Sequence, residues 1–327
     1  MSERVKILVP GDNPTQIGGS PPLEKLASYG DLELFTDTPA SAEEKVARAE
    51  GAQVIINTRG VVTWREEMRM LPDLKMIATC SIGTDMIDLN IATELGIVVS
   101  NQPGRTAPVV AEHMFGLMFA LSKRAYFQTA ELKAGRWTRM MNTMLQGKVL
   151  GVVGTGAIGV EMARLARAIG MEIVAWTFNP SDERAKEYGV RFVELDELLQ
   201  MSDVVSLHVK LTEDSRHLVG VRELALMKEG ALLLNGARGD VLDIAALRES
   251  LLAGHLGGAG LDVFPEEPLP TDHPILDCEQ LVLTPHAADQ TLEGVNLLNE
   301  GAVDNVIAFL EGRPQNNVAV GRDGTVD

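Results

Sequence analysis

Three ionisable side chains follow apolar, strand-like segments in the second half of the sequence. Arg238 ends the run LLLNGAR, Glu267 follows GLDVF and His286 follows LVLTP. Histidine titrates near neutral pH and can act as a general acid toward a carbonyl oxygen. A nearby carboxylate favours the imidazolium and fixes its tautomer, and an arginine can donate two hydrogen bonds to a carboxylate or carbonyl. These residue types could therefore bind and protonate a ketone that accepts a hydride.

Each of the three residues on its own has a simpler explanation. Arginine and glutamate at the start of a loop are usually solvated, and a single histidine after a strand is usually structural. The functional interpretation depends on three strands that end at one edge of a parallel sheet. Ligands of open α/β sheets bind outside the carboxyl ends of the strands, so we expect Arg238, Glu267 and His286 to converge there.

A glycine-rich loop lies upstream of these residues. Gly154, Gly156 and Gly159 form GTGAIG, directly after the strand-like KVLGVV and directly before an expected helix, Val160–Ile169. The first glycine allows a tight turn, the second lets the backbone approach a pyrophosphate, and the third lets helix and strand pack closely. A turn that only packs a helix is the alternative. The strand–loop–helix context favours a dinucleotide site.

The dinucleotide fingerprint also expects an acidic residue at the end of the next strand, where it binds the adenosine ribose. Counting about 20 residues onward leads to Val174–Phe178, which contains no acid. No carboxylate would therefore repel a 2′-phosphate, and the first arginine downstream is Arg184. These residues leave NAD and NADP both open.

Short β-branched runs alternate with amphipathic segments, which is typical of parallel sheets covered by helices on both faces. In the first part of the chain we expect helices at Ala42–Ala49 and Ile87–Leu95 and strands at Val5–Val9, Leu32–Thr36, Val54–Asn57, Met76–Thr79 and Ile97–Ser100. A second series starts at Lys148, with strands at Val149–Val153, Glu172–Trp176, Val204–His208, Ala231–Asn235, Ala259–Val263 and Leu281–Leu283. The sequence predicts an α/β fold of two doubly wound parallel-sheet domains.

The two series are separated by a turn-rich stretch, Asn101–Pro108, and a long helix, Val109–Ser122, whose middle is apolar nearly all round. Such a helix must be buried on several sides. A last helix, Leu292–Leu310, is too isolated to form a domain and could pack back on the first. We therefore expect a discontinuous first domain, residues 1–101 and 290–327, and a second domain at residues 102–289.

Composition excludes several classes of protein. The 327 residues carry a formal net charge of −17, and 45% of them are hydrophobic. So acidic a surface repels nucleic acid and anionic lipid. No apolar run is long enough to span a membrane and no signal peptide is visible, so we expect a cytoplasmic protein. The two cysteines, Cys80 and Cys278, are too few for a disulfide framework or a four-cysteine zinc site. We expect both to be buried apolar residues.

The segments LLLNGARGDVLD, GLDVFPEEPLP and LTPHAAD resemble the three signature segments of the D-isomer-specific 2-hydroxyacid dehydrogenase family. SIGTDMIDL, SNQPGRTAPVVAEH and GTGAIG also fit, so the resemblance spans nearly the whole chain. It implies a Rossmann cofactor domain at 102–289 and a flavodoxin-like substrate domain. It also implies that Arg238 binds the substrate carboxyl and carbonyl, that Glu267 supports the histidine, and that His286 is the acid/base.

The resemblance further implies binding residues. Asp262 would face the nicotinamide carboxamide, and two loops of the first domain would offer backbone donors to a substrate carboxylate. No metal site is implied. The implied cofactor contacts are Thr106, Gly154, Gly156, Ala157, Ile158, Gly159, Thr177, His208, Val209, Thr212, Ala237, Asp262 and Ala288, and the implied substrate contacts are Thr58, Arg59, Gly60, Ile82 and Gly83.

The sequence departs from the family pattern at two positions near the expected adenosine site. The usual ribose aspartate aligns with Thr177, and Lys210 stands where a proline is common. Lys210 could attract a 2′-phosphate or simply be solvated, and we expect the second. At Glu267, formate-oxidising relatives carry glutamine, which disfavours formate.

The residues and the resemblance together predict an NAD-dependent D-2-hydroxyacid dehydrogenase, with NADP as the alternative cofactor. The breadth of the family, and no particular residue, indicates glyoxylate or hydroxypyruvate as the 2-oxo acid. The alternative is a corepressor-like scaffold that binds NAD without turnover. We also expect a homodimer, because the helix Val109–Ser122 is followed by Trp137, Met140, Met141 and Met144 and exposed apolar patches are rare on monomers. These side chains could instead cap the core of their own domain.

Overall fold

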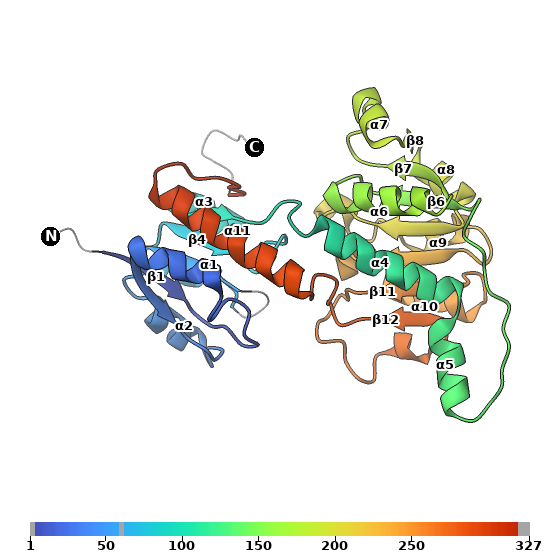
Figure 1. Ribbon diagram of the computed structural model, residues 1–327, viewed down its shortest axis with the longest axis horizontal. Helices are drawn as coiled ribbons and strands as arrows, with labels where there is room; N and C mark the ends of the chain where they lie inside the picture. The colour runs from blue at the N-terminus through green and yellow to red at the C-terminus, as the bar shows by residue number, and fades with distance from the viewer. Residues whose placement is uncertain (1–3, 59–61, 320–327) are drawn as a thin grey trace. The chain divides into compact units, whose positions relative to one another are not determined.

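The computed structural model describes residues 4–58 and 62–319. The chain forms two compact units, one made of Met1–Thr106 with Thr291–Asp327 and the other of Ala107–Gln290 (Figure 1). The sequence places the first boundary at 101 and the second at 289, close to these positions. In the described residues each unit contains one parallel sheet, with five strands in the first and seven in the second, which confirms the predicted fold class.

The first unit is a flavodoxin-like sheet with the strand order β2-β1-β3-β4-β5. Its strands are β1 (Val5–Val9), β2 (Gly30–Leu34), β3 (Val54–Asn57), β4 (Met76–Thr79) and β5 (Val98–Ser100). The central strands β3 and β4 are buried at every residue. This explains their continuous apolar sequence, because a parallel strand is covered on both faces.

Helices cover both faces of this first sheet. Residues of α2, η2 and α3 share one apolar cluster, and residues of α1, η1 and α11 share the other. The last helix of the chain therefore packs back on the first unit, beside β4, as expected (Figure 1). The helical bounds are α1 (Pro21–Glu24), η1 (Lys25–Ser28), α2 (Ala42–Ala49), η2 (Glu66–Met70), α3 (Leu89–Leu95) and α11 (Leu292–Leu310).

The second unit has the strand order β12-β11-β10-β9-β6-β7-β8, the doubly wound Rossmann arrangement with one additional strand. All its strand pairs are parallel. The strands are β6 (Val149–Val153), β7 (Glu172–Trp176), β8 (Arg191–Phe192), β9 (Val204–Leu207), β10 (Leu232–Asn235), β11 (Gly258–Leu261) and β12 (Leu281–Leu283).

Helices cover both faces of the second sheet as well. One apolar cluster contains residues of α4 and α6, and the other contains residues of α8, α9 and α10. The helical bounds are α4 (Ala107–Ser122), α5 (Ala125–Lys133), α6 (Ala157–Ala168), α7 (Asp182–Tyr188), α8 (Leu195–Met201), η3 (Glu213–Ser215), α9 (Val221–Leu226), η4 (Gly239–Val241), α10 (Ile244–Leu252) and η5 (Pro274–Asp277).

The helix α4 lies very close to the second sheet. A side chain on Gly236 would collide with Met114, and one on Gly260 would crowd Leu117. Glycine at these positions lets the helix approach β10 and β11 directly. This explains why the apolar sequence of α4 extends almost all round, since α6 packs against it from another side (Figure 1).

The edge strands are where the sequence and the structure differ. We expected Leu32–Thr36, but β2 spans Gly30–Leu34, and three of its five residues are exposed. We did not expect β8, a strand of two residues at the edge of the second sheet. An edge strand is covered less than a central one, so apolar residues do not mark its ends.

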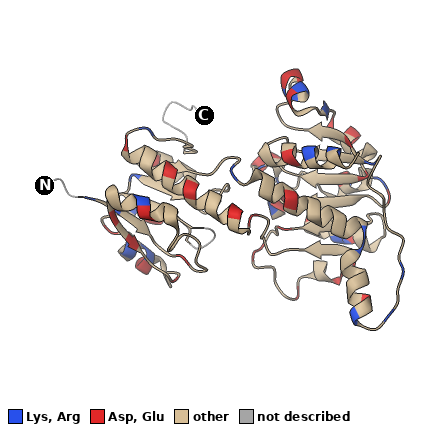
Figure 2. Cartoon of the chain, in the orientation of Figure 1, with Lys and Arg blue, Asp and Glu red and all other residues tan. Residues whose placement is uncertain are grey.

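Charged residues are distributed along both units, with acidic and basic residues interspersed (Figure 2). Among the residues that the structure describes, no helix is long and apolar enough to cross a membrane. Cys80 and Cys278 are both buried and unpaired, as expected.

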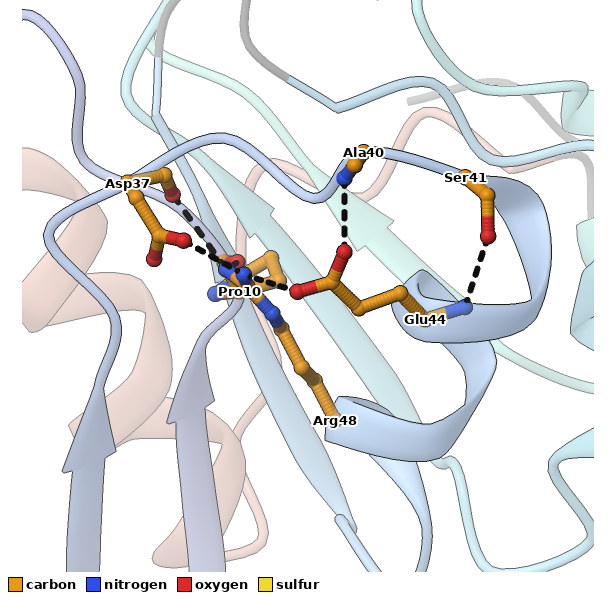
Figure 3. Close-up of polar contacts among 6 residues, drawn as sticks. All are labelled: Pro10, Asp37, Ala40, Ser41, Glu44 and Arg48. Atoms are coloured by element: carbon orange, nitrogen blue, oxygen red, sulfur yellow. Dashed lines mark hydrogen bonds and ion pairs between the residues drawn. The ribbon is translucent and has the colours of Figure 1, made fainter.

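A buried arginine joins three segments of the first unit (Figure 3). Arg48 on α2 donates to the carbonyl of Pro10, which follows β1, and to the carbonyl and carboxylate of Asp37, which lies beyond β2. It also pairs with Glu44 one turn earlier, whose other oxygen accepts from the Ala40 N–H. The Arg48 side chain is only 6% exposed. It therefore holds the loops after β1 and β2 against α2.

We expect Arg48→Ala to lower the free energy of unfolding by about 1–3 kcal/mol, because the buried Pro10 carbonyl loses its charged donor. Arg69→Ala is the matched control. Arg69 also pairs with two carboxylates, Glu66 and Glu94, but is 43% exposed, so its loss should change the free energy by less than about 1 kcal/mol. Urea denaturation measures both. Equal effects of the two substitutions would contradict this role of Arg48.

Candidate active site

His286 and Glu267 form a close pair in the second unit. His286 Nδ1 lies 2.6 Å from Glu267 Oε2, and each side chain is about one-third exposed. The other carboxylate oxygen, Oε1, accepts the Phe264 N–H at 2.9 Å. Because an ionised carboxylate only accepts hydrogen bonds, His286 donates from Nδ1, and this fixes its tautomer. The pair has the geometry of a histidine held for proton transfer at Nε2.

The pKa of the Glu267 carboxyl lies below its usual value. Burial alone would raise this pKa, but the hydrogen bonds from His286 and from the Phe264 N–H outweigh burial. The charges of His286 and Arg238 lower it further. Glu267 therefore remains a carboxylate at neutral pH and can stabilise a positive charge on the imidazole.

The loop that carries Arg238 is held by a buried asparagine. The Asn235 side chain, 1% exposed, accepts from the Ala237 N–H and donates to the Arg238 carbonyl. Gly239 follows, and a Cβ there would lie 2.0 Å from the carbonyl carbon of Phe264. Only glycine lets the Arg238 loop come this close to the segment leading to Glu267. The sequence prediction did not single out Asn235, although it is the first residue of NGAR.

His286 itself has a backbone conformation that is uncommon for a residue with a side chain. Its φ is +50°, in the left-handed region, which costs about 1–2 kcal/mol. The turn is stabilised by the buried carboxylate of Asp262, which accepts the N–H groups of Ala287 and Ala288 and the hydroxyl of Thr284. Strain of this kind is commonly found at functional sites. Asp262 thus shapes the turn, and its contact with a nicotinamide stays a prediction.

The glycine loop has the conformation that a dinucleotide needs. Gly154 has φ +99°, and a Cβ there would lie 2.8 Å from the backbone of His208. A Cβ on Gly159 would lie 2.0 Å from the Gly154 carbonyl oxygen, whereas one on Gly156 would meet nothing within 4 Å. Space is therefore open above Gly156, where α6 begins without a side-chain cap. The first N–H groups of a twelve-residue helix are well placed for a phosphate.

Other expected cofactor residues lie around this loop. Ala157 and Ile158 form the first turn of α6, which begins three residues before the expected Val160 because Gly156 is its N-cap. His208 and Val209 follow β9, and Thr212 caps η3. His208 Nδ1 is buried without a hydrogen-bond partner among the described residues. Burial lowers the pKa of His208 to about 4, so this imidazole is neutral at pH 7.

The residues that would contact the adenosine ribose include no carboxylate. Thr177 follows β7, whose last carbonyl, that of Trp176, accepts the Gly154 N–H. The guanidinium of Arg184 donates to the Thr155 carbonyl and hydroxyl within the glycine loop and to the Asn179 carbonyl. Arg184 therefore links the glycine loop to the segment after β7, a role that the sequence did not indicate. Lys210 is exposed, as expected.

The expected substrate residues lie in the first unit, after β3 and β4. The Thr58 hydroxyl donates to the Gly11 carbonyl, and Ser81 and Asn101 donate to the carbonyls of Gly83 and Ile82. Arg59 and Gly60 lie outside the described residues. Thr106 ends the first segment of this unit, with a buried hydroxyl that has no partner in the described part of the chain.

The second unit thus brings Arg238, Glu267 and His286 to one edge of its sheet, together with Asp262, Ala237 and Ala288. The described residues contain no group of three or more metal-binding side chains.

The sequence profile of the "D-isomer specific 2-hydroxyacid dehydrogenase, NAD binding domain" matches residues 115–288. The glyoxylate reductase of Korarchaeum cryptofilum is 36% identical over 297 residues, 89% of this chain and 90% of that protein. The chain belongs to the D-isomer specific 2-hydroxyacid dehydrogenase family. It is an NAD-dependent oxidoreductase that transfers a hydride between a 2-hydroxy acid and a 2-oxo acid.

Two further relatives of this dehydrogenase are informative. The glycerate dehydrogenase of Methylorubrum extorquens is 38% identical over 287 residues, 84% of this chain and 88% of that protein. The crystal structure of the D-lactate dehydrogenase of Aquifex aeolicus, in complex with NAD and lactic acid, has a TM-score of 0.83 and 30% identity. That alignment covers 96% of this chain and 99% of the other. The predicted family, fold and cofactor class are thereby confirmed.

We expect the wild-type enzyme to use NADH, with less discrimination against NADPH than an aspartate would impose. Thr177→Asp should increase the preference for NADH about tenfold or more, because a carboxylate bonds the ribose hydroxyls and repels a 2′-phosphate. The measurement is kcat/KM for both cofactors. Thr177→Asn is the control, since it adds a similar volume without charge. A wild-type preference for NADPH would contradict the prediction.

Proposed function

We propose that this dehydrogenase reduces a small 2-oxo acid, glyoxylate or hydroxypyruvate, to its D-2-hydroxy acid, with His286 as the general acid/base. The 2.6 Å pair between His286 and Glu267 carries the proposal. The names of the relatives support the choice of substrate, because they include glyoxylate reductases and a glycerate dehydrogenase. NADH supplies the hydride when it is bound beside the substrate.

In this mechanism His286 gives a proton to the carbonyl oxygen as that oxygen gains negative charge. The proton leaves Nε2, because Nδ1 remains bonded to Glu267. The carboxylate of Glu267 accepts the hydrogen bond from Nδ1 and keeps the ring oriented during the step. In the reverse direction the neutral imidazole takes the hydroxyl proton of the 2-hydroxy acid.

Arg238 binds the substrate in this proposal. Its guanidinium can donate two parallel hydrogen bonds to the carboxylate and the carbonyl of a 2-oxo acid. Gly239 and Asn235 fix the loop that carries it, so the cation is placed before substrate arrives. The contacts from Thr58, Arg59, Gly60, Ile82 and Gly83 to the substrate carboxylate stay predictions.

We also propose a homodimer. The exposure of three side chains after α5 supports this proposal over the alternative in which they cap the core of their own unit, since Trp137 is 79% exposed, Met141 91% and Met144 65%. This segment has no helix or strand between Lys133 and Val149. Large exposed apolar side chains so close together are typical of an interface. A cytoplasmic location is likewise a proposal, carried by composition alone.

The roles of His286 and Arg238 are distinguished by kinetics with a panel of 2-oxo acids. His286→Ala should lower kcat by about 10²–10⁴-fold, the usual contribution of a positioned acid, with the Kd of NADH nearly unchanged. Arg238→Ala should act mainly on KM, because it removes the donors for the carboxylate. If His286→Ala kept wild-type turnover, His286 would be excluded as the general acid.

The panel must include glyoxylate, hydroxypyruvate and pyruvate, assayed by oxidation of NADH. His255→Ala is the control, because this histidine lies in the same unit and its imidazole contacts the Leu224 carbonyl. Higher kcat/KM for pyruvate than for the other two acids would contradict the substrate choice. NADH binding without turnover of any acid would instead favour a corepressor-like scaffold.

Light scattering at micromolar concentration tests the homodimer. We expect about twice the 35.3 kDa of one chain, and a monomer after Trp137→Ser combined with Met141→Ser, because these substitutions remove apolar surface from the contact. Val221→Ser is the control, since Val221 is 72% exposed but lies on α9. A monomeric wild-type protein would refute the interface.

A further inference from the structure

Asp262 is an ionised group in a place that water hardly reaches. Its side chain is 1% exposed at the end of β11. Burial alone would raise its pKa, but the hydrogen bonds it accepts from His113, Thr284 and the two N–H groups of the following turn lower that pKa instead. A carboxylate buried so deeply must be surrounded by donors, since an unpaired buried charge is very costly.

Two of these donors form a chain that begins on α4. Thr284 Oγ1 donates to Asp262 Oδ1 at 2.6 Å, and a hydroxyl has only one hydrogen to give. His113 Nε2 lies 2.9 Å from the same hydroxyl oxygen. His113 Nε2 must therefore carry a hydrogen and donate it to the Thr284 hydroxyl oxygen. The order of donors runs from His113 to Thr284 to Asp262, and His113 Nε2 is also 3.5 Å from the carboxylate.

The same carboxylate holds the turn in which His286 lies. Oδ1 accepts the Ala287 N–H at 2.8 Å and Oδ2 accepts the Ala288 N–H at 3.0 Å. The His286 N–H returns to the Thr284 carbonyl at 3.0 Å. Thr284 therefore contacts the turn through its backbone and Asp262 through its side chain. Rotation of its hydroxyl away from Asp262 would remove a donor from the carboxylate that holds the turn after His286.

We propose that His113 is a positioning residue for His286, acting through the hydroxyl of Thr284 and the carboxylate of Asp262. By donating to Thr284, His113 leaves the hydroxyl only one direction for its own hydrogen, toward Asp262. This strengthens the bond to the carboxylate, because consecutive hydrogen bonds polarise one another. The inference rests on the proposed role of His286, but every contact that carries it lies within the second unit.

An apolar residue would be expected at position 113 if α4 only needed packing. The neighbouring helix positions that face the sheet, Val110, Met114 and Leu117, are apolar and buried. A histidine that is 24% exposed fills this place less completely. Its contribution is the N–H group directed at Thr284. Glutamine can supply an equivalent N–H at the end of its side chain, whereas phenylalanine cannot.

Kinetics of matched variants test the proposal. Thr284→Val should lower kcat about 10- to 100-fold, because a hydrogen bond to a charged group is lost, while the Kd of NADH changes less than about twofold. Thr284→Ser restores the hydroxyl and should recover most of kcat. His113→Phe should lower kcat about 3- to 10-fold, and His113→Gln should recover it. Thr129→Val on α5 is the control.

If His113 acts through Thr284, the double variant His113→Phe with Thr284→Val should be no slower than Thr284→Val alone. Independent contributions that multiply would overturn the proposal. So would wild-type kcat in Thr284→Val, or a loss that Thr284→Ser does not recover. These outcomes differ from failure of the proposed function, in which His286→Ala itself retains turnover.

Nuclear magnetic resonance (NMR) tests the positioning of His286 without substrate, even if no 2-oxo acid is turned over. The protein has six histidines, and the imidazole resonance of His286 is assigned by its absence in His286→Ala. At pH 7 this resonance should move in Thr284→Val and in His113→Phe, and stay in place in Thr284→Ser and Thr129→Val. An unmoved His286 resonance in Thr284→Val would show that the hydroxyl does not position the ring.

Discussion

The candidate site depends on the hydrogen bonds that the buried carboxylate of Asp262 accepts. A negative charge at 1% exposure is tolerated only when donors surround it. Its donors come from the end of β12 and from the turn that follows, and His113 on α4 donates to one of them, Thr284. The backbone of that turn places His286 at φ +50°. The hydrogen bonds that satisfy the buried charge of Asp262 therefore also hold the turn that places the imidazole of His286.

The parallel sheet provides the second condition. Because β10, β11 and β12 are adjacent and parallel, the loops after them share one edge, and this brings Arg238, Glu267 and His286 together from segments far apart in the sequence. Glycine makes the approach close enough. Gly239 leaves space for the backbone before Glu267, and Gly236 and Gly260 leave space for α4 to pack against the sheet. Larger side chains at these positions would separate the loops from the helix that supports them.

The glycine loop, Gly154 to Gly159, follows β6 in the same sheet, and β9 separates β6 from β10. β6 lies next to β9, and the backbone after β9 packs under Gly154. Arg184 then fastens the loop to the segment after β7. If the adenosine ribose binds beside Thr177, as we predict, no carboxylate there repels a 2′-phosphate, and discrimination between NAD and NADP depends on weaker contacts.

The sequence by itself determined the alternation of strands and helices, the glycine loop and the three signature segments. These features are local, because central parallel strands are continuously apolar and a tight turn requires glycine at fixed spacing. It did not determine the limits of the edge strands β2 and β8, whose residues are partly solvated. Nor did it reveal the partners of Asp262. His113 and Thr284 are 171 residues apart, and only the packing of α4 against the ends of β11 and β12 brings them within hydrogen-bond distance. The exposure of Trp137 and Met141 was likewise decided by tertiary structure, since an apolar residue has the same sequence signature in a core and at an interface.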